Sequence, residues 1–256
     1  MANSILTPEE STNLYDMLQQ FSSIHYGSTA HFKKSVRKRA DLLAKSHREA
    51  IENNDGSAAD QTFIEHYFLL QKMARESLKN LNRKDLPVKN GIPDVYLFAE
   101  IVLSKTDSQL STAFIMACID VFQSVRYLTN SEHEFLKAAF SIAILNGIVN
   151  ERYDANCENN LEHYFSQIYA LESVDFEAIL NTKNHLEELL KQDPSGDYPK
   201  MDRRTRAIYR YKVNKLAVLW KKSDEETVKN LLEMNQQDSN HEKCQNEHIG
   251  FQIYKE

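Results

Sequence analysis

The feature that most constrains this chain is its shortage of residues that break helices. Only six glycines and five prolines occur among its 256 residues, whereas the two together make up roughly 12% of an average protein. Tight turns in sheet-rich folds depend strongly on these residues, so the shortage favours long helices with few connections. The sequence predicts an all-α fold, with one domain of roughly nine to ten helices over residues 1–235 and a polar tail over 236–256.

Capping signals and apolar periodicity predict where the helices lie. Thr7 with Glu10, and Thr129 with Glu132, form the capping-box pattern that begins a helix. Residues 82–91 are predicted to be a polar connection, and residues 249–254 a short extended piece. The first predicted helix begins after Thr7, and the others cover residues 29–54, 60–81, 93–103, 108–128, 129–147, 156–171, 174–191, 202–221 and 224–235.

Composition and cysteine usage limit the class of protein. The net charge of −6 gives no sign of polyanion binding. Cys118, Cys157 and Cys244 are widely spaced and odd in number, which argues against a disulfide framework. The longest apolar runs, such as Ala113–Ile119, are about seven residues long, whereas a membrane helix needs about 18 or more. We expect a reduced, cytoplasmic chain with neither a secretion signal nor a membrane-spanning helix.

The most unusual segment is an arginine- and tyrosine-rich block that follows Pro194 and Pro199. Between Arg203 and Lys222 it holds eight basic residues and no acidic one. On a helix these arginines form a stripe beside an apolar one, so the basic stripe is expected to be at least partly exposed. An alternative is a solvated face neutralised by neighbouring carboxylates. The candidate site for an anion, a partner protein or a glucan comprises Tyr198, Asp202, Arg203, Arg206, Tyr209 and Arg210.

Other charged patterns give weaker signals. A second basic run over residues 33–48 could suit nucleic acid or a membrane surface, but its apolar stripe is thin and the chain is acidic, so neither is expected. His241, Cys244 and His248 have a metal-like spacing inside a polar tail, and we expect no metal or other cofactor. The paired carboxylates Glu187 and Glu188 are expected on a helix surface. Phosphate-binding glycine loops and serine-hydrolase elbows are absent, so no catalytic residue is assigned.

Read with the residues before it, the same block resembles a motif of the cyclic β-1,2-glucan synthase family. The family pattern DPxGxYxxMDxxTRxxYR is matched by residues 193–210. Other segments agree in the same order along the chain, namely IPDVYLFAEIVLSKTDSQLS over 92–111, YLTNSEHEF over 127–135 and EHIGFQIY over 247–254. The similarity extends from about residue 60 to the last residue.

The resemblance implies a bacterial helical domain that corresponds to one region of those enzymes. Their membrane segments, glycosyltransferase domain and phosphorylase-like domain have no counterpart in this sequence. Members of the family build β-1,2-linked glucan from UDP-glucose and cyclise it, but the residues of that chemistry lie in the missing domains. The resemblance thus implies a noncatalytic protein of carbohydrate metabolism that contacts a membrane glucan synthase or another envelope-glucan protein, at the inner membrane. The alternatives are a glucan-binding or carbohydrate-active protein and a nucleic-acid-binding regulator.

The block also departs from the family pattern. Arg203 and Arg204 stand where Phe-Ala is common, and Asn214 and Lys215 replace an acidic pair. These changes keep the spacing of the motif but make its surface more basic. The placement of these basic additions therefore bears on whether the block is a docking face or a solvated one.

Overall fold

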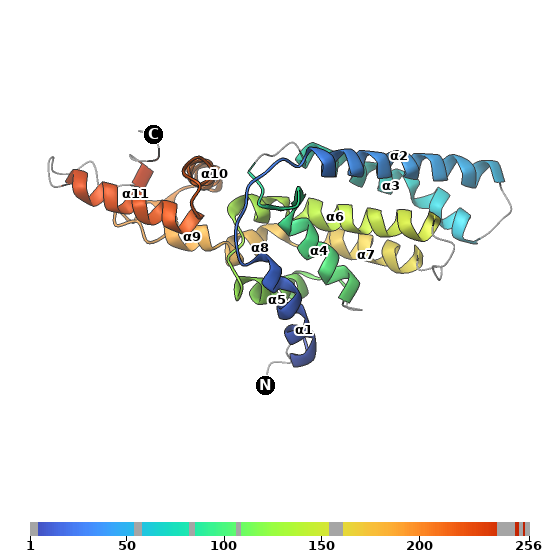
Figure 1. Cartoon of the computed structure of the whole chain (residues 1–256), viewed down its shortest axis with the longest axis horizontal. Helices are drawn as coiled ribbons and strands as arrows, with labels where there is room; N and C mark the ends of the chain where they lie inside the picture. Colours follow the sequence, from blue (N-terminus) through green and yellow to red (C-terminus); the bar gives the residue numbers. More distant parts are fainter. Residues whose placement is uncertain are drawn as a thin grey trace. The chain divides into compact units, whose positions relative to one another are not determined.

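Long helices dominate the fold, as the shortage of glycine and proline predicts (Figure 1). The computed structural model describes residues 5–53, 58–81, 85–105, 109–153, 161–239, 249–250 and 253. Helices account for 79% of the structure, and a two-stranded sheet is the one sheet within those ranges. The all-α prediction is confirmed. None of the described helices combines the length and the apolar composition that crossing a membrane requires.

The chain divides into two compact units. The first unit comprises Met1–Val125 and Phe135–Phe176, and the second comprises Arg126–Glu134 and Glu177–Glu256. Helix α6 (Asn130–Tyr153) begins in the second unit and continues in the first, while α8 (Phe176–Lys183) leads back into the second. Each unit has its own buried apolar residues, so each is described by itself.

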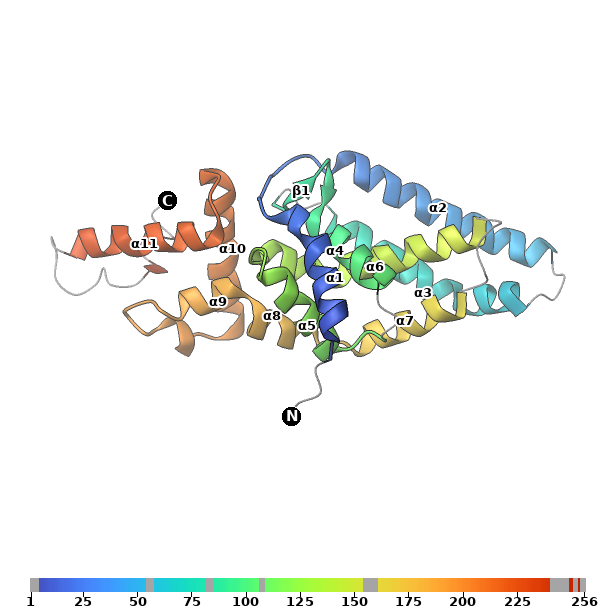
Figure 2. The same cartoon turned by 60° about the horizontal axis from the view of Figure 1, so that its bottom comes forward.

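The first unit is built on pairs of neighbouring helices. Helices α2 and α3 lie side by side, and α1 packs against α4 and α5 (Figures 1 and 2). Its core is rich in aromatic rings, with Phe122 contacting Phe98 at a centroid distance of 5.3 Å and Phe21 at 5.8 Å. Besides most of α6, the unit contains α1 (Pro8–Leu18), η1 (Gln19–Phe21), α2 (Ala30–Asn53), α3 (Ala58–Asn80), α4 (Asp94–Lys105), α5 (Thr112–Gln123) and α7 (Leu161–Ser173).

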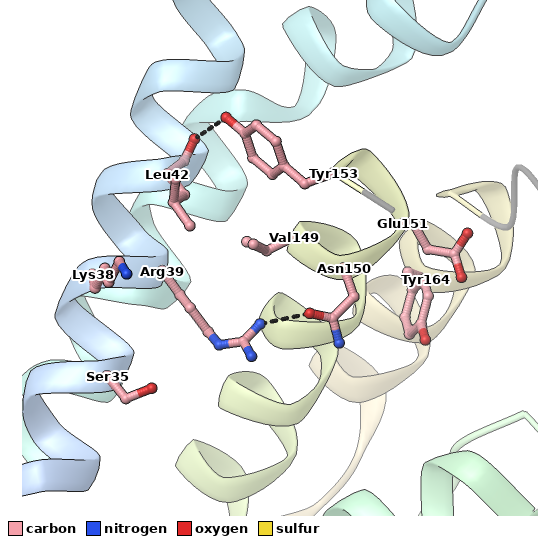
Figure 3. A pocket seen from close by; sticks show the side chains of 9 residues that line it. All are labelled: Ser35, Lys38, Arg39, Leu42, Val149, Asn150, Glu151, Tyr153 and Tyr164. Atoms are coloured by element: carbon pink, nitrogen blue, oxygen red, sulfur yellow. Dashed lines mark hydrogen bonds between the residues drawn. The ribbon is translucent and has the colours of Figure 1, made fainter. Parts of the chain in front are cut away.

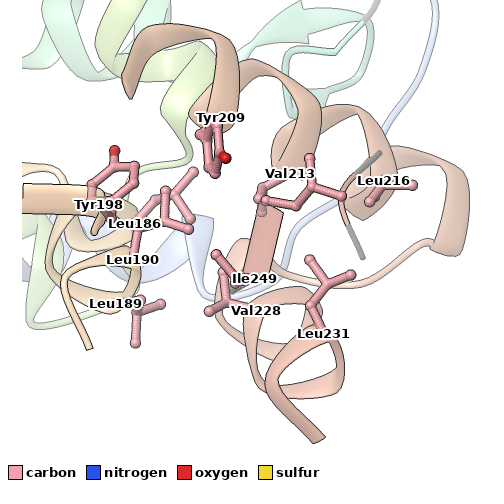
Figure 4. Close-up of a cluster of buried hydrophobic side chains, with 11 residues drawn as sticks. Leu186, Leu189, Leu190, Tyr198, Tyr209, Val213, Leu216, Val228, Leu231 and Ile249 are labelled. Atoms are coloured by element: carbon pink, nitrogen blue, oxygen red, sulfur yellow. The ribbon is translucent and has the colours of Figure 1, made fainter. Parts of the chain in front are cut away.

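The second unit is a smaller helical group with its own apolar core. It contains most of α8, then α9 (His185–Leu190), η2 (Tyr198–Lys200), α10 (Arg203–Trp220) and α11 (Asp224–Ser239). Side chains from α9, α10, α11 and the C-terminal segment meet in this core (Figure 4). Its buried members are Leu186, Leu189, Leu190, Tyr198, Tyr209, Val213, Leu216, Val228, Leu231, Ile249 and Ile253.

Local capping signals place the helix starts correctly. In α1 the Thr7 hydroxyl accepts from the Glu10 amide at 3.1 Å, and the Glu10 carboxylate accepts from the Thr7 amide at 2.8 Å. The corresponding bonds of the Thr129 and Glu132 box measure 3.3 and 2.8 Å. Both capping boxes are therefore confirmed.

Several helix boundaries differ from the prediction. Helix α5 begins at Thr112, where the Ser111 hydroxyl caps it by accepting from the Phe114 amide at 3.2 Å. The predicted cap, Ser108, lies outside the described residues. Helix α6 runs past Gly147 to Tyr153, and Gly147 lies within the helix where the Tyr164 ring packs against it. The single helix expected over 174–191 is interrupted at Asn184, whose side chain caps α9 by accepting from the Leu186 amide at 3.0 Å. Helix α11 continues to Ser239.

The two remaining differences from the prediction concern a short β-hairpin and the C-terminal segment. Strands β1 (Val88–Lys89) and β2 (Ile92–Pro93) pair antiparallel within the expected polar connection. Asn90 and Gly91 have φ values of 53° and 78°, the left-handed pair that a tight hairpin turn requires. At the other end, Ile249, Gly250 and Ile253 are helical, so the extended prediction is wrong there. Ile249 and Ile253 both lie in the core of the second unit.

Candidate functional site

The arginine- and tyrosine-rich block converges on a buried carboxylate, Glu187 of α9. Arg206 Nη1 lies 2.8 Å from Glu187 Oε1, and Arg210 Nη1 lies 2.5 Å from Oε2. The Tyr198 hydroxyl donates to the same Oε2 at 2.8 Å. The Glu187 side chain is 1% exposed. Two guanidinium groups and a phenol are thus directed at one internal carboxylate, so these donor atoms form contacts inside the second unit.

The turn before α10 places these groups. Gly196 adopts a φ of 63°, which the sharp turn requires. Asp193 closes the turn by accepting from the Ser195 hydroxyl at 2.9 Å and from the Ile249 amide at 3.3 Å. Asp202 then caps α10 by accepting from the amides of Arg204 and Thr205. The acidic and glycine positions of the motif therefore build the turn and the helix start.

Burial fixes the protonation of the tyrosine in this cluster. The pKa of Tyr198 is raised well above its usual range, first by burial and then by the charge and hydrogen bond of Glu187. The hydroxyl therefore stays protonated and donates to the carboxylate. The Tyr209 ring packs against Tyr198 at a centroid distance of 5.9 Å, so the faces of both rings belong to the core rather than to a sugar-binding surface.

The structure divides the candidate residues into two groups. Tyr198, Tyr209 and Arg210 are buried, and Arg206 is half-buried beside them. Asp202 and Arg203 are exposed and do not join the cluster. Arg203 lies 2.6 Å from Glu177 in an exposed ion pair, the arrangement expected for a solvated face.

Sequence reasoning missed the residue at the centre of the cluster. Glu187 was expected on a helix surface, but it is buried, while its neighbour Glu188 has a side chain 62% exposed. The available signal was the surrounding sequence HLEELL, in which leucines flank the first glutamate closely on both sides. A carboxylate on so apolar a helix requires a cationic partner if it is buried.

A second buried polar group lies at the start of α6. Arg126 donates two hydrogen bonds of 2.8 Å to the Glu132 carboxylate, which also accepts from the Thr129 amide in the capping box. Beside it, burial lowers the pKa of His133 to about 4, against an opposing effect of the Glu132 charge. His133 is therefore neutral near pH 7. The Arg126–Glu132 pair and the Thr129 cap stabilise the beginning of the helix, whereas the two ring nitrogens of His133 are buried without a hydrogen-bond partner among the described residues.

The outward side of α10 has a different character. Five exposed residues follow one another at spacings of four, three, four and four, namely Arg204, Ile208, Tyr211, Lys215 and Leu219. We call these five residues the α10 face. Its apolar members are 40% (Ile208), 55% (Tyr211) and 71% (Leu219) exposed. Near its end a hollow of about 400 Å³ is lined by Trp220, Lys222, Asn230, Glu233 and Met234.

The other candidates have simpler outcomes. The second basic run lies on α2, where Lys34, Arg37 and Lys38 are exposed. His241, Cys244 and His248 lie outside the described residues, and the described part contains no group of three or more His, Cys, Asp or Glu placed to hold a metal.

Comparison with known proteins adds no identification. The chain matches no protein-family model and no curated protein sequence.

Proposed function

We propose that this chain is a noncatalytic helical protein that binds another protein through the α10 face. Following the motif resemblance, we propose a membrane glucan synthase of cyclic β-1,2-glucan synthesis as the partner. The observation that carries the proposal is the α10 face itself, where three large apolar side chains stand exposed between basic ones. Exposed apolar surface rimmed by polar groups is typical of a protein-binding surface.

The inner side of α10 supports a protein partner over a sugar. A glucan would need the faces of Tyr198 and Tyr209, yet these side chains are only 0% and 8% exposed. Arg210 is committed to Glu187. The outer side, by contrast, offers aromatic and aliphatic anchors of the kind that contribute most to protein interfaces.

Charge indicates the kind of surface that the partner presents. The three basic additions that depart from the family pattern, Arg203, Arg204 and Lys215, are all exposed. Arg203 is paired with Glu177, but the segment from Arg203 to Lys222 itself contains no carboxylate, and Arg204 and Lys215 lie on the α10 face. An acidic partner surface would complement this side and speed association at low salt.

Binding of the full-length chain to a purified membrane glucan synthase, reconstituted in nanodiscs, tests the proposal. Tyr211→Ala and Leu219→Ala each remove an exposed anchor without touching the core, and we expect each to weaken binding about tenfold, as loss of about 1.4 kcal/mol would. Tyr169→Ala is the matched control, because Tyr169 is also 55% exposed but lies on α7.

Two results would contradict the proposal. Absence of binding to the synthase would remove the proposed partner. Equal losses in Tyr211→Ala and Tyr169→Ala would show that the α10 face is not the contact.

A further inference from the structure

A groove in the first unit has the composition of a ligand site and is separate from the α10 face. It encloses about 720 Å³, within the range of small-molecule pockets. Helix α2 supplies one wall, and α6 with α7 supplies the other (Figure 3). Its lining includes Lys38, Arg39, Leu42, Asn150, Tyr153 and Tyr164.

The central charged group of this groove is Arg39. Its Nη1 donates to Asn150 Oδ1 at 2.8 Å and to the Asn146 carbonyl at 3.5 Å, and the guanidinium points across the groove toward α6 (Figure 3). Both acceptors are neutral. Arg39 is therefore held in one orientation while its positive charge is left without a carboxylate partner among the described residues. Lys38 lines the same groove and adds a second positive charge.

Part of the remaining wall is aromatic and aliphatic and is fixed in place. Tyr153 Oη accepts from the Ser46 hydroxyl at 2.8 Å and donates to the Leu42 carbonyl at 3.3 Å, which joins α6 to α2 at one end of the groove. Leu42 and Val149 lie beside it (Figure 3). An oriented guanidinium next to an aromatic and aliphatic wall suits a molecule that has an anionic group and an apolar body.

Helix packing supports the far side of the groove. A Cβ added at Gly147 would lie 2.2 Å from the Tyr164 ring, so this ring packs directly against the α6 backbone. Because only glycine permits that approach, the position of Tyr164 in the groove is set by the sequence of α6. Close packing between α6 and α7 thus sets this side of the groove.

We propose that the α2–α6 groove binds a small organic anion, with its carboxylate or phosphate group paired to Arg39 and its apolar body against Tyr153 and Leu42. A guanidinium with free donors recognises either anion through paired hydrogen bonds. A nucleic acid is the less suitable occupant, because Glu151 also lines the groove and opposes a polyanion. Lys34 and Arg37, two exposed basic residues of the run, lie outside the lining, whereas Lys38 is part of it.

The experiment uses the full-length chain and three probes, phenyl phosphate, phenylacetate and inorganic phosphate. Binding is followed by calorimetry and by the ¹⁵N side-chain resonance of Arg39. We expect at least one aromatic probe to bind and to shift the Arg39 resonance. Arg39→Gln should weaken that binding at least tenfold. Arg37→Gln is the matched control, since Arg37 is an exposed arginine on the same helix, and it should leave the affinity within about twofold.

The probes also distinguish the anion. Stronger binding of phenyl phosphate selects a phosphate ligand, and stronger binding of phenylacetate selects a carboxylate, while the apolar wall predicts that inorganic phosphate binds more weakly than phenyl phosphate. Three outcomes overturn the proposal: no probe shifts the Arg39 resonance, Arg37→Gln weakens binding as much as Arg39→Gln, or a short DNA duplex binds the run with equal sensitivity to both variants. Circular dichroism of Arg39→Gln ensures that a loss is not due to unfolding.

Discussion

Arg210 in the second unit and Arg39 in the first show two opposite uses of the same side chain. Arg210 is 4% exposed and lies 2.5 Å from the carboxylate of Glu187. Arg39 is half-buried, and its hydrogen-bond acceptors are an amide and a backbone carbonyl. One arginine neutralises an internal charge, whereas the other keeps its charge available at a groove.

Arginine density alone therefore does not locate a binding site. The densest block of the sequence places its two inner arginines on an internal carboxylate. The second run, which has the weaker signal, contains an arginine that is oriented but not neutralised. The two cases differ in the charge of the hydrogen-bond acceptor. A buried carboxylate neutralises the guanidinium, whereas a neutral acceptor leaves its positive charge available to a ligand.

The largest effect is expected when the internal carboxylate is removed. Glu187→Ala leaves two guanidinium groups without their anion, one of them buried, and should lower the free energy of unfolding by about 3–5 kcal/mol. Chemical denaturation measures this loss. Glu188→Ala is the control, with its side chain 62% exposed, and should change stability by less than about 0.5 kcal/mol. Similar losses in both variants would mean that Glu187 is not the partner of a buried charge.

The next effect concerns the pH dependence of the second unit. The pKa of His133 is lowered from 6.5 to about 4 by burial. Between these pH values the unfolded state binds the proton and the folded state does not, so stability is full above pH 6.5 and falls as the pH drops toward 4. The loss should reach about 3 kcal/mol.

The variant His133→Leu tests this directly. It should have a flatter stability profile than the parent between pH 7 and pH 4, measured by denaturation at each pH. Parallel profiles for the two proteins would show that His133 titrates normally in the folded state.

A smaller loss is expected from the phenol in the cluster. Tyr198→Phe removes the hydroxyl that donates to Glu187 at 2.8 Å, while both arginines remain. Loss of one buried hydrogen bond to a charged group should cost about 2 kcal/mol. Tyr211→Phe is the control, because Tyr211 is 55% exposed, and thermal unfolding should not distinguish it from the parent. An unchanged melting temperature in Tyr198→Phe would show that the two arginines stabilise the buried Glu187 carboxylate without the phenol.

Much of the fold could be predicted because its signals are local. The caps at Thr7, Thr129 and Asp202 each depend on residues within three positions, and each caps its helix as its sequence pattern indicates. The hairpin was missed although Asn90-Gly91 is a strong local turn signal, because the surrounding segment is polar. The boundaries of α5 and α6 were less accurate, since helices in a packed core end where packing requires.

The candidate site was harder to predict because its contacts are distant in sequence. Glu187 lies 19 residues from Arg206 and 23 from Arg210, and no spacing rule joins them. The motif identified the arginines but not the carboxylate with which they form ion pairs. The groove at Arg39 depends on Asn150, 111 residues away, so only the fold could bring it together.

The smallest stability effect is expected at Arg39, and it separates the two arginines most directly. Arg39→Gln loses hydrogen bonds to neutral acceptors only, so unfolding should change by no more than about 1 kcal/mol. Arg210→Gln leaves Glu187 buried with one fewer cation and should cost about 3 kcal/mol or more. Both variants are compared by urea denaturation under the same conditions. If Arg39→Gln destabilises the chain as much as Arg210→Gln, Arg39 is also a structural residue. The proposed difference between a neutralised arginine and an arginine available to a ligand would then be wrong.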